Sequence, residues 1–204
     1  MTYNEYSWNT DSHILFLDQP VNVGFSYSDD GSRVDRSTIA GEDAYVFFQL
    51  FFARFPKYAS APFHMASESY GGTYAPHAAS IFHKKNQELS LAPIPGLTRI
   101  NLASVILANG LTDPLEQFAT VRDYACYGPY RILDPDGKEC NSMKRGSAIC
   151  ERFIRACYRF PTRAGCLSAA YYCYSQLYTP MESTYSVILH FTPFIVHIFP
   201  QRRD

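Results

Sequence analysis

Residues 62–76 read PFHMASESYGGTYAP. The run 62–66 is short and apolar, as expected of a buried strand, and residues 74–85 place apolar side chains on one side of a helix. A tight strand-to-helix turn with small flanking residues is the setting of a nucleophile elbow, which lifts one serine hydroxyl above a sheet. Ser69 is therefore the candidate nucleophile, and the N–H of Tyr70 stands at a helix start, where it can stabilise an oxyanion.

The turn departs from the usual pattern at one position. Ser67 occupies the place of the first glycine in Gly-x-Ser-x-Gly. The pentapeptide alone is a weak signal, and only the strand and helix around it strengthen it. The alternative interpretation is a glycine-rich helix entry without chemistry.

The segments on either side of this turn continue an alternation of strands and helices. Residues 13–18 and 101–108 are short apolar runs that predict strands, and residues 37–55 have one broad apolar face and predict a helix. Strand, helix, strand, helix, strand is the pattern of a parallel sheet covered by helices on both faces. The fold class predicted is α/β.

Composition excludes several classes of protein. The 204 residues carry 18 basic and 19 acidic side chains, a formal net charge of −1, so no basic surface for nucleic acid is indicated. Apolar residues make up 47% and charged residues 18%, which is the balance of a folded chain and not of a disordered one. We expect no cofactor and no metal.

Six cysteines lie between Cys126 and Cys173 and none elsewhere. An even number in one polar stretch predicts disulfides made in an oxidising compartment, although the sequence leaves many pairings open. A zinc cluster is less favoured because the stretch has no Cys-x-x-Cys pair and no histidine. Residues 150–157 suggest a helical turn or two.

The predicted organisation has three parts. Residues 1–122 form a partial α/β core, residues 123–178 a cysteine-rich insertion, and residues 179–204 a divergent tail of uncertain origin. The N-terminus lacks the features of a secretory signal, which suggests that the natural start lies upstream. The apolar tail is interrupted by prolines and histidines and is short for a membrane span, so we expect a buried strand, an amphipathic tail or non-native sequence.

Three blocks resemble the signature blocks of the serine carboxypeptidases, most closely the fungal carboxypeptidase Y type. They are DQPVNVGFSYS at residues 18–28, ESYGGTYAP at residues 68–76 and NGLTDP at residues 109–114. The similarity extends from about residue 4 to about residue 181. By this resemblance the chain is a central fragment with a partial α/β-hydrolase fold.

The resemblance implies a hydrolase that releases single residues from peptide or protein C-termini through an acyl-enzyme. It makes Ser69 the nucleophile and gives Glu68 a role in binding the substrate's terminal carboxylate. A glutamic acid kept protonated by burial or by an acidic neighbour could donate a hydrogen bond to that carboxylate, and activity would then be best in acid. A vacuolar or secreted location follows from the family and from the cysteines.

The resemblance also implies a set of disulfides. The family's insertion carries nested bridges, which correspond here to Cys126–Cys140, Cys150–Cys173 and Cys157–Cys166. Each bridge of this kind stabilises a fold by about 2–4 kcal/mol.

A serine nucleophile needs a base and a carboxylate that orients it, and the family's blocks for both are absent from this chain. The histidines are His13, His64, His77, His83, His190 and His197. His77 would lie about 12 Å along the helix from Ser69, and no other histidine has a matching context. Asp18 and Asp113 end strands without an adjacent histidine and are expected to fix loop backbone.

The fragment is therefore expected to be inactive alone. One alternative is a non-catalytic interaction protein that binds through the cysteine-rich insertion. Another is an esterase or lipase on the same sheet, which is disfavoured because Glu68 suits a charged substrate and not an uncharged ester.

Overall fold

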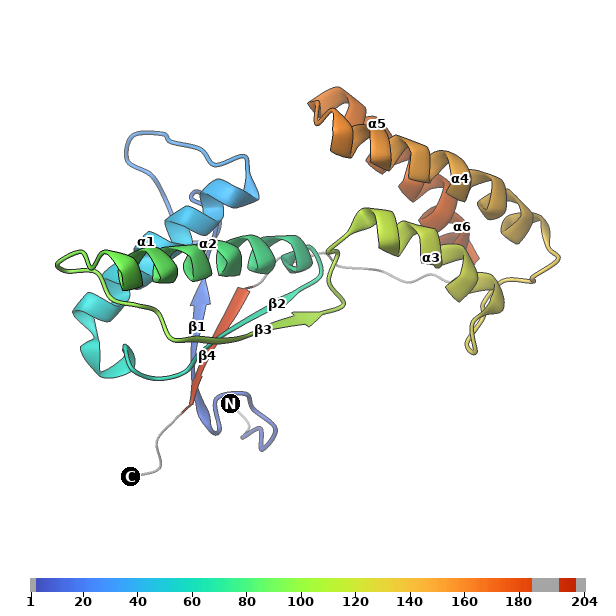
Figure 1. Ribbon diagram of the computed structural model, residues 1–204. Helices are drawn as coiled ribbons and strands as arrows, with labels where there is room; N and C mark the ends of the chain where they lie inside the picture. The colour runs from blue at the N-terminus through green and yellow to red at the C-terminus, as the bar shows by residue number, and fades with distance from the viewer. Residues whose placement is uncertain (1–2, 185–194, 201–204) are drawn as a thin grey trace. The chain divides into compact units, whose positions relative to one another are not determined.

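The computed structural model describes residues 3–184 and 195–200 (Figure 1). The chain divides into two compact units, one made of residues 1–111 with 191–204 and the other of residues 112–190. Each unit has its own buried residues.

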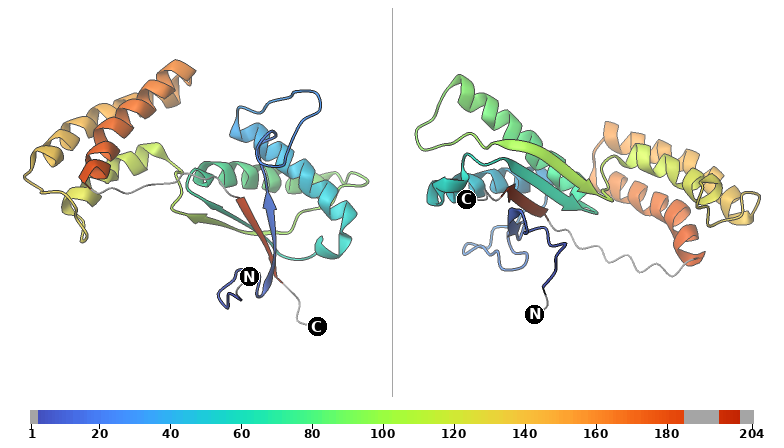
Figure 2. Two further views of the ribbon diagram at one scale, coloured as in Figure 1. Left: turned by 180° about the vertical axis from the view of Figure 1, so that it is seen from behind. Right: turned by 90° about the horizontal axis from the view of Figure 1, so that it is seen from below.

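The first unit is built on a four-stranded sheet with the order β1-β4-β2-β3 (Figures 1 and 2). The strands are β1 (Ser12–Leu17), β2 (Phe63–Glu68), β3 (Leu102–Ala108) and β4 (Ile195–Pro200). β2 and β3 are parallel, and β4 is antiparallel to both β1 and β2. β1, β2 and β3 therefore run in one direction, as the α/β pattern predicts.

β4 comes from the tail. Its six residues pair with β1 on one side and with β2 on the other. This segment of the tail is therefore a strand, although nothing in the sequence placed it between two strands. The apolar residues 185–194 lie outside the described part of the chain.

Two helices connect the parallel strands. α1 (Ser37–Arg54) follows β1, and α2 (Gly71–Leu91) follows β2. Phe55 caps the C-terminus of α1, and its N–H donates to the Phe51 carbonyl at 2.8 Å. The proline that follows cannot continue the α-helical hydrogen bonding, and a short 3₁₀ turn, η1 (Pro56–Tyr58), comes next.

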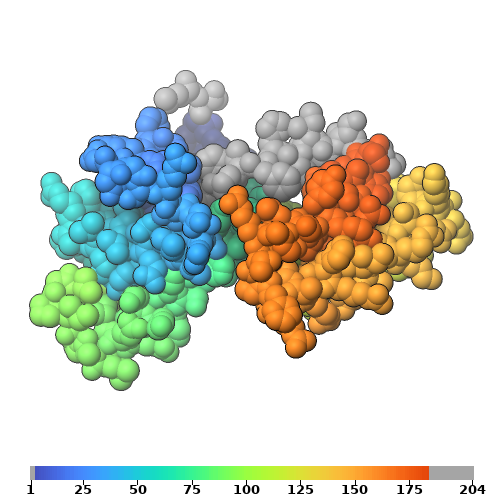
Figure 3. Space-filling view, turned by 90° about the horizontal axis from the view of Figure 1, so that it is seen from above, coloured from blue at the N-terminus to red at the C-terminus, as the bar shows by residue number. Residues whose placement is uncertain are grey.

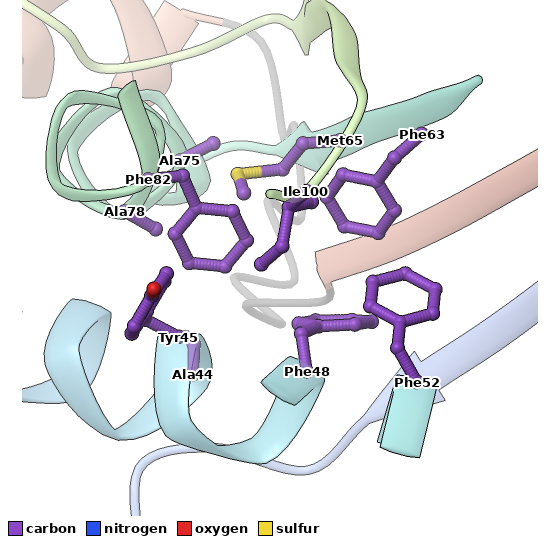
Figure 4. Packing of buried hydrophobic residues seen from close by; sticks show 10 residues of the cluster. All are labelled: Ala44, Tyr45, Phe48, Phe52, Phe63, Met65, Ala75, Ala78, Phe82 and Ile100. Carbon is purple, nitrogen blue, oxygen red and sulfur yellow. The ribbon is translucent and has the colours of Figure 1, made fainter. Parts of the chain in front are cut away.

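The core of this unit is a cluster of aromatic and small side chains between α1, α2 and β2 (Figure 4). Phe48 of α1 lies 4.7 Å from the ring of Phe63 and 6.0 Å from that of Phe82, measured between centroids. The alanines of α2 let the two helices approach closely. The cluster consists of Ala44, Tyr45, Phe48, Phe52, Phe63, Met65, Ala75, Ala78, Phe82 and Ile100.

Both helices cover the same face of the sheet. Phe63 and Met65 are two residues apart in β2 and so lie on one face of it, and they share one buried cluster with side chains of both helices. The alternation of strands and helices suggested one helix on each face, and this detail was wrong. The order β1, β2, β3 advances in one direction across the sheet. Crossovers of one hand then put successive helices on one face.

The second unit is helical. It contains α3 (Pro114–Tyr127), α4 (Lys138–Arg159), α5 (Arg163–Cys173), the π-helical turn η2 (Tyr174–Tyr178) and α6 (Thr179–Thr184). Disulfides join Cys126–Cys140, Cys150–Cys173 and Cys157–Cys166, the pairs named in the sequence analysis. Figure 3 shows the surfaces of α4 and α5 in yellow-orange to orange.

The bridges connect α3 to α4 and α4 to α5, so they tie the helices of the second unit to one another. Disulfide-bonded cysteines also fill its interior together with Met143, Ile154 and Leu177. Within the described residues, no helix is both long and apolar enough to span a bilayer.

Candidate active site

Ser69 sits on a sharp bend between the end of β2 and the start of α2. Its φ of 57° is in the left-handed region, which residues other than glycine rarely adopt. Its N–H donates to the Ala108 carbonyl at 3.0 Å, which extends the β2–β3 pairing by one residue, and its carbonyl accepts the Gly72 N–H at 3.0 Å. The strand therefore reverses into the helix within one residue, and Ser69 remains half-buried.

A second bend, at the end of β3, packs against the first. Asn109 has a φ of 47°, and the N–H of Leu111 donates to the Ser69 carbonyl at 2.9 Å. A Cβ atom added to Gly72 would lie 2.6 Å from the backbone of Gly110, closer than real contacts allow. Only glycine fits at position 72 without a shift of one of the two bends.

Two side-chain hydroxyls hold the bends. The Ser67 hydroxyl, in a residue only 5% exposed, donates to the Gly71 carbonyl at 2.9 Å. The Thr73 hydroxyl donates to the Leu111 carbonyl at 2.7 Å. Ser67, which departs from the usual pattern, thus makes a hydrogen bond that glycine could not make.

Tyr70 is the first residue after the bend and is 46% exposed. Its ring meets that of Tyr74 edge to face at 5.1 Å, and burial together with the neighbouring Tyr70 raises the pKa of Tyr74. The Tyr70 N–H has no acceptor among the described residues. That N–H is therefore available to a ligand beside Ser69.

Glu68 ends β2 with its side chain exposed. The resemblance implied a buried or acid-flanked carboxyl that stays protonated. In the described part of the chain the Glu68 side chain is exposed, so the burial expected at this position is absent.

Three of the histidines, His13, His64 and His77, make contacts away from Ser69. His77 Nδ1 lies 2.7 Å from the Ser37 hydroxyl, and His64 Nδ1 lies 2.8 Å from the Ser104 hydroxyl. The His13 ring packs against Tyr58 with centroids 5.0 Å apart. The Ser69 hydroxyl has no hydrogen-bond partner within residues 3–184, and His190 lies outside the described residues.

Two aspartates have structural roles, as the sequence indicated. Asp18 accepts the Phe25 N–H at 2.9 Å and closes the loop after β1. Asp113 caps α3 by accepting the Leu115 N–H at 3.0 Å, and it also accepts the Tyr158 hydroxyl at 2.7 Å. These hydrogen bonds hold the pKa of the Asp113 carboxyl below its usual value. The hydrogen bond from the Tyr158 hydroxyl has the largest effect, and the one from the Leu115 N–H comes next. Residues 3–184 contain no cluster of three ligand-type side chains placed to hold a metal ion.

The sequence located the turn but missed the residues that hold it. Asn109-Gly110 after a strand is a turn signal and could have indicated the second bend. Nothing in the sequence shows that Thr73 reaches the Leu111 carbonyl, because that contact depends on how two strands lie side by side.

Comparison with protein families identifies related sequences. The family model described as serine carboxypeptidase matches residues 1–192. Carboxypeptidase Y homolog A of Trichophyton verrucosum is 44% identical over 183 residues, which cover 89% of this chain and 31% of that protein. The protein of the same name from Sordaria macrospora is 42% identical over 183 residues, which cover 89% of this chain and 30% of its own length.

Comparison with solved structures supports the fold. A prohormone-processing carboxypeptidase from Saccharomyces cerevisiae matches with a TM-score of 0.59 at 20% sequence identity. The match covers 78% of this chain and 34% of that structure. The chain thus spans about a third of the length of the relatives it matches.

Proposed function

The chain belongs to the serine carboxypeptidase family, and from this premise we propose that Ser69 is the nucleophile of a hydrolase that releases residues from peptide C-termini. The observation that carries the proposal is the bend itself. It places a serine at a positive φ of 57°, between a parallel strand and a helix. This is the geometry of a nucleophile elbow.

In the proposed reaction the Ser69 oxygen attacks the carbonyl carbon of the last peptide bond. The carbonyl oxygen, as it becomes negatively charged, accepts a hydrogen bond from the Tyr70 N–H, which has no acceptor within the described part of the chain. Collapse of the tetrahedral intermediate breaks the C–N bond, and the C-terminal residue leaves as an amine that takes up the proton released by the Ser69 hydroxyl. Water later hydrolyses the acyl-enzyme and restores Ser69.

Glu68 is proposed to contact the terminal carboxylate of the substrate, since it adjoins the nucleophile. Its exposed side chain is accessible to such a ligand. Peptide and protein C-termini are the proposed partners, and a vacuolar or secreted compartment is the proposed location, where the three disulfides would persist.

We further propose that the 204-residue chain alone turns over peptides very slowly. The Ser69 proton needs a base, and His13, His64 and His77 are engaged elsewhere. Loss of the base from a serine triad lowers kcat by roughly 10⁶-fold.

A covalent probe tests the assignment without requiring turnover. We expect a fluorophosphonate to modify Ser69 in the intact chain slowly and at this serine alone, detected by peptide mass spectrometry, and to leave Ser69→Ala unmodified. Ser80→Ala, on the exposed side of α2, is the matched control and should react like the unaltered chain. An adduct on a different serine, or none at all, would contradict the proposal.

Substrate assays separate the peptidase from the esterase interpretation. The intact chain is incubated with a blocked dipeptide and with a nitrophenyl ester. Peptide trimming that disappears in Ser69→Ala supports the peptidase, whereas Ser69-dependent cleavage of the ester alone supports an esterase.

A further inference from the structure

We propose that Ser67 and Thr73 are positioning residues that hold the nucleophile elbow in its reactive shape. The inference rests on the proposed role of Ser69 and adds a role for two residues that do not themselves meet the substrate. Their hydroxyls donate hydrogen bonds at two separate points around the bend. One acceptor is in the first turn of α2, and the other is in the segment that follows β3.

Thr73 acts through Leu111. The Ser69 N–H donates to the Ala108 carbonyl at 3.0 Å, and the Ser69 carbonyl accepts both the Leu111 N–H at 2.9 Å and the Gly72 N–H at 3.0 Å. The position of Leu111 therefore helps to set the direction of the Ser69 carbonyl, together with the first turn of α2. The segment that carries Leu111 also contains Asn109, which is in the left-handed region, and Gly110. Because glycine adopts many backbone conformations, this segment needs further contacts to fix its conformation.

The Thr73 hydroxyl provides that tether. It lies four residues after Ser69, about one helical turn along α2, and donates to the Leu111 carbonyl at 2.7 Å. The contacts thus form a closed loop through Ser69, Leu111 and Thr73. In this loop α2 positions the Leu111 segment, and that segment in turn positions Ser69.

Ser67 acts across the bend. Ser67 is the second-to-last residue of β2, and its buried hydroxyl donates to the Gly71 carbonyl at 2.9 Å. This hydrogen bond spans Glu68, Ser69 and Tyr70. The hydrogen bond fixes the first turn of α2 relative to β2. The direction of the Tyr70 N–H, the proposed oxyanion donor, depends on that same turn.

The experiment uses Thr73→Val, which keeps the shape of the side chain and removes its donor, and Thr73→Ser, which restores the donor. Ser67→Ala and Ser67→Gly make the corresponding change at the other hydroxyl. Thr120→Val is the matched control, because the Thr120 hydroxyl also donates to a backbone carbonyl, that of Gln117 at 3.0 Å, in the second unit.

Two measurements are made on the full chain. Amide hydrogen exchange of Leu111 and Ser69 is compared with that of Phe48 in the core, and the rate of Ser69 phosphonylation is followed. A neutral hydrogen bond corresponds to roughly a 2- to 12-fold effect. We expect Thr73→Val to speed Leu111 and Ser69 exchange and to slow phosphonylation by about that factor, while Phe48 exchange stays unchanged and Thr73→Ser restores both rates.

For the Ser67 variants we expect slower phosphonylation with unchanged Leu111 exchange, since Ser67 does not touch that segment. Equal exchange at Leu111 and Ser69 in Thr73→Val and Thr120→Val would overturn the role of Thr73. Unchanged phosphonylation in both Ser67 variants would overturn that of Ser67. If Ser69 does not react with the phosphonate in the unaltered chain, the proposed function fails. Amide hydrogen exchange at Ser69 in Thr73→Val and in Ser67→Ala then decides by itself whether the two hydroxyls hold the bend.

Discussion

Two tyrosine hydroxyls in the second unit donate to carboxylates, but different causes dominate their pKa values. The Tyr174 hydroxyl lies 2.6 and 2.8 Å from the two Glu182 carboxylate oxygens, and this hydrogen bond is the main reason that its pKa rises to about 12. The pKa of Tyr158 also rises to about 12, mainly because burial disfavours the phenolate and only secondly through Asp113.

The variants Glu182→Gln and Asp113→Asn should therefore differ in effect. Glu182→Gln removes the dominant cause at Tyr174, so one tyrosine should return to titrate near the ordinary value of 10.0. Asp113→Asn leaves the burial of Tyr158 in place, so its pKa should fall less. Absorbance at about 295 nm measures the titration, and far-UV circular dichroism shows whether the fold persists at each pH. Equal shifts in the two variants would contradict these causes.

The sign of the effect on stability follows from linkage. A tyrosine whose pKa is raised by folding binds its proton more tightly in the folded chain. Its contribution to stability is complete below the ordinary pKa of 10.0 and is lost as the pH rises through about 12. The free energy of unfolding of the second unit should accordingly decrease across this interval, and less steeply in Glu182→Gln.

Among the elements, α1 contributes the largest share of aromatic side chains to the core of the first unit. Phe48 is 0% exposed and contacts the rings of Phe63 and Phe82 (Figure 4). Phe48→Ala should lower the free energy of unfolding by about 3–5 kcal/mol, because it removes buried apolar surface and leaves a cavity. Phe25→Ala is the matched control, since Phe25 is 96% exposed, and should change it by less than about 0.5 kcal/mol. Urea unfolding measures both, and equal effects would argue against this core.

The sequence predicted the three parallel strands to within about two residues, because short apolar runs between turn residues are a strong local signal. It placed the start of α2 at Tyr74, whereas the helix begins at Gly71 and includes Pro76. Two glycines and a proline disfavour a helix locally, and packing of Gly72 against Gly110 outweighs that preference.

The length of α4 was underestimated for a different reason. Its buried positions include Cys140, Met143, Cys150 and Ile154, which recur at helical spacing only if cysteine is counted as apolar. With the cysteines interpreted as disulfides in a polar, loop-like stretch, the sequence predicts only a helical turn or two at residues 150–157. The contacts around Ser69 could not be predicted at all, since they join Thr73 of one helix to Leu111 beyond the next strand.

In the molecule as a whole, each of the two units is stabilised internally by a different kind of interaction. The first has a cluster of packed rings and contains no cysteine, since all six lie within residues 112–190. The second has a smaller interior in which buried disulfides take the place of large apolar side chains. Reducing agent should therefore act on one unit and leave the other unaffected.

Differential scanning calorimetry of the full chain with and without dithiothreitol tests this expectation. Each disulfide stabilises a fold by about 2–4 kcal/mol, which is comparable to the total stability that a helical unit of this size obtains from its core. Reduction should lower the midpoint of one transition markedly or abolish it, and Phe48→Ala should lower only the other. A single transition that responds to both changes would contradict the expectation that the rings and the bridges stabilise separate units.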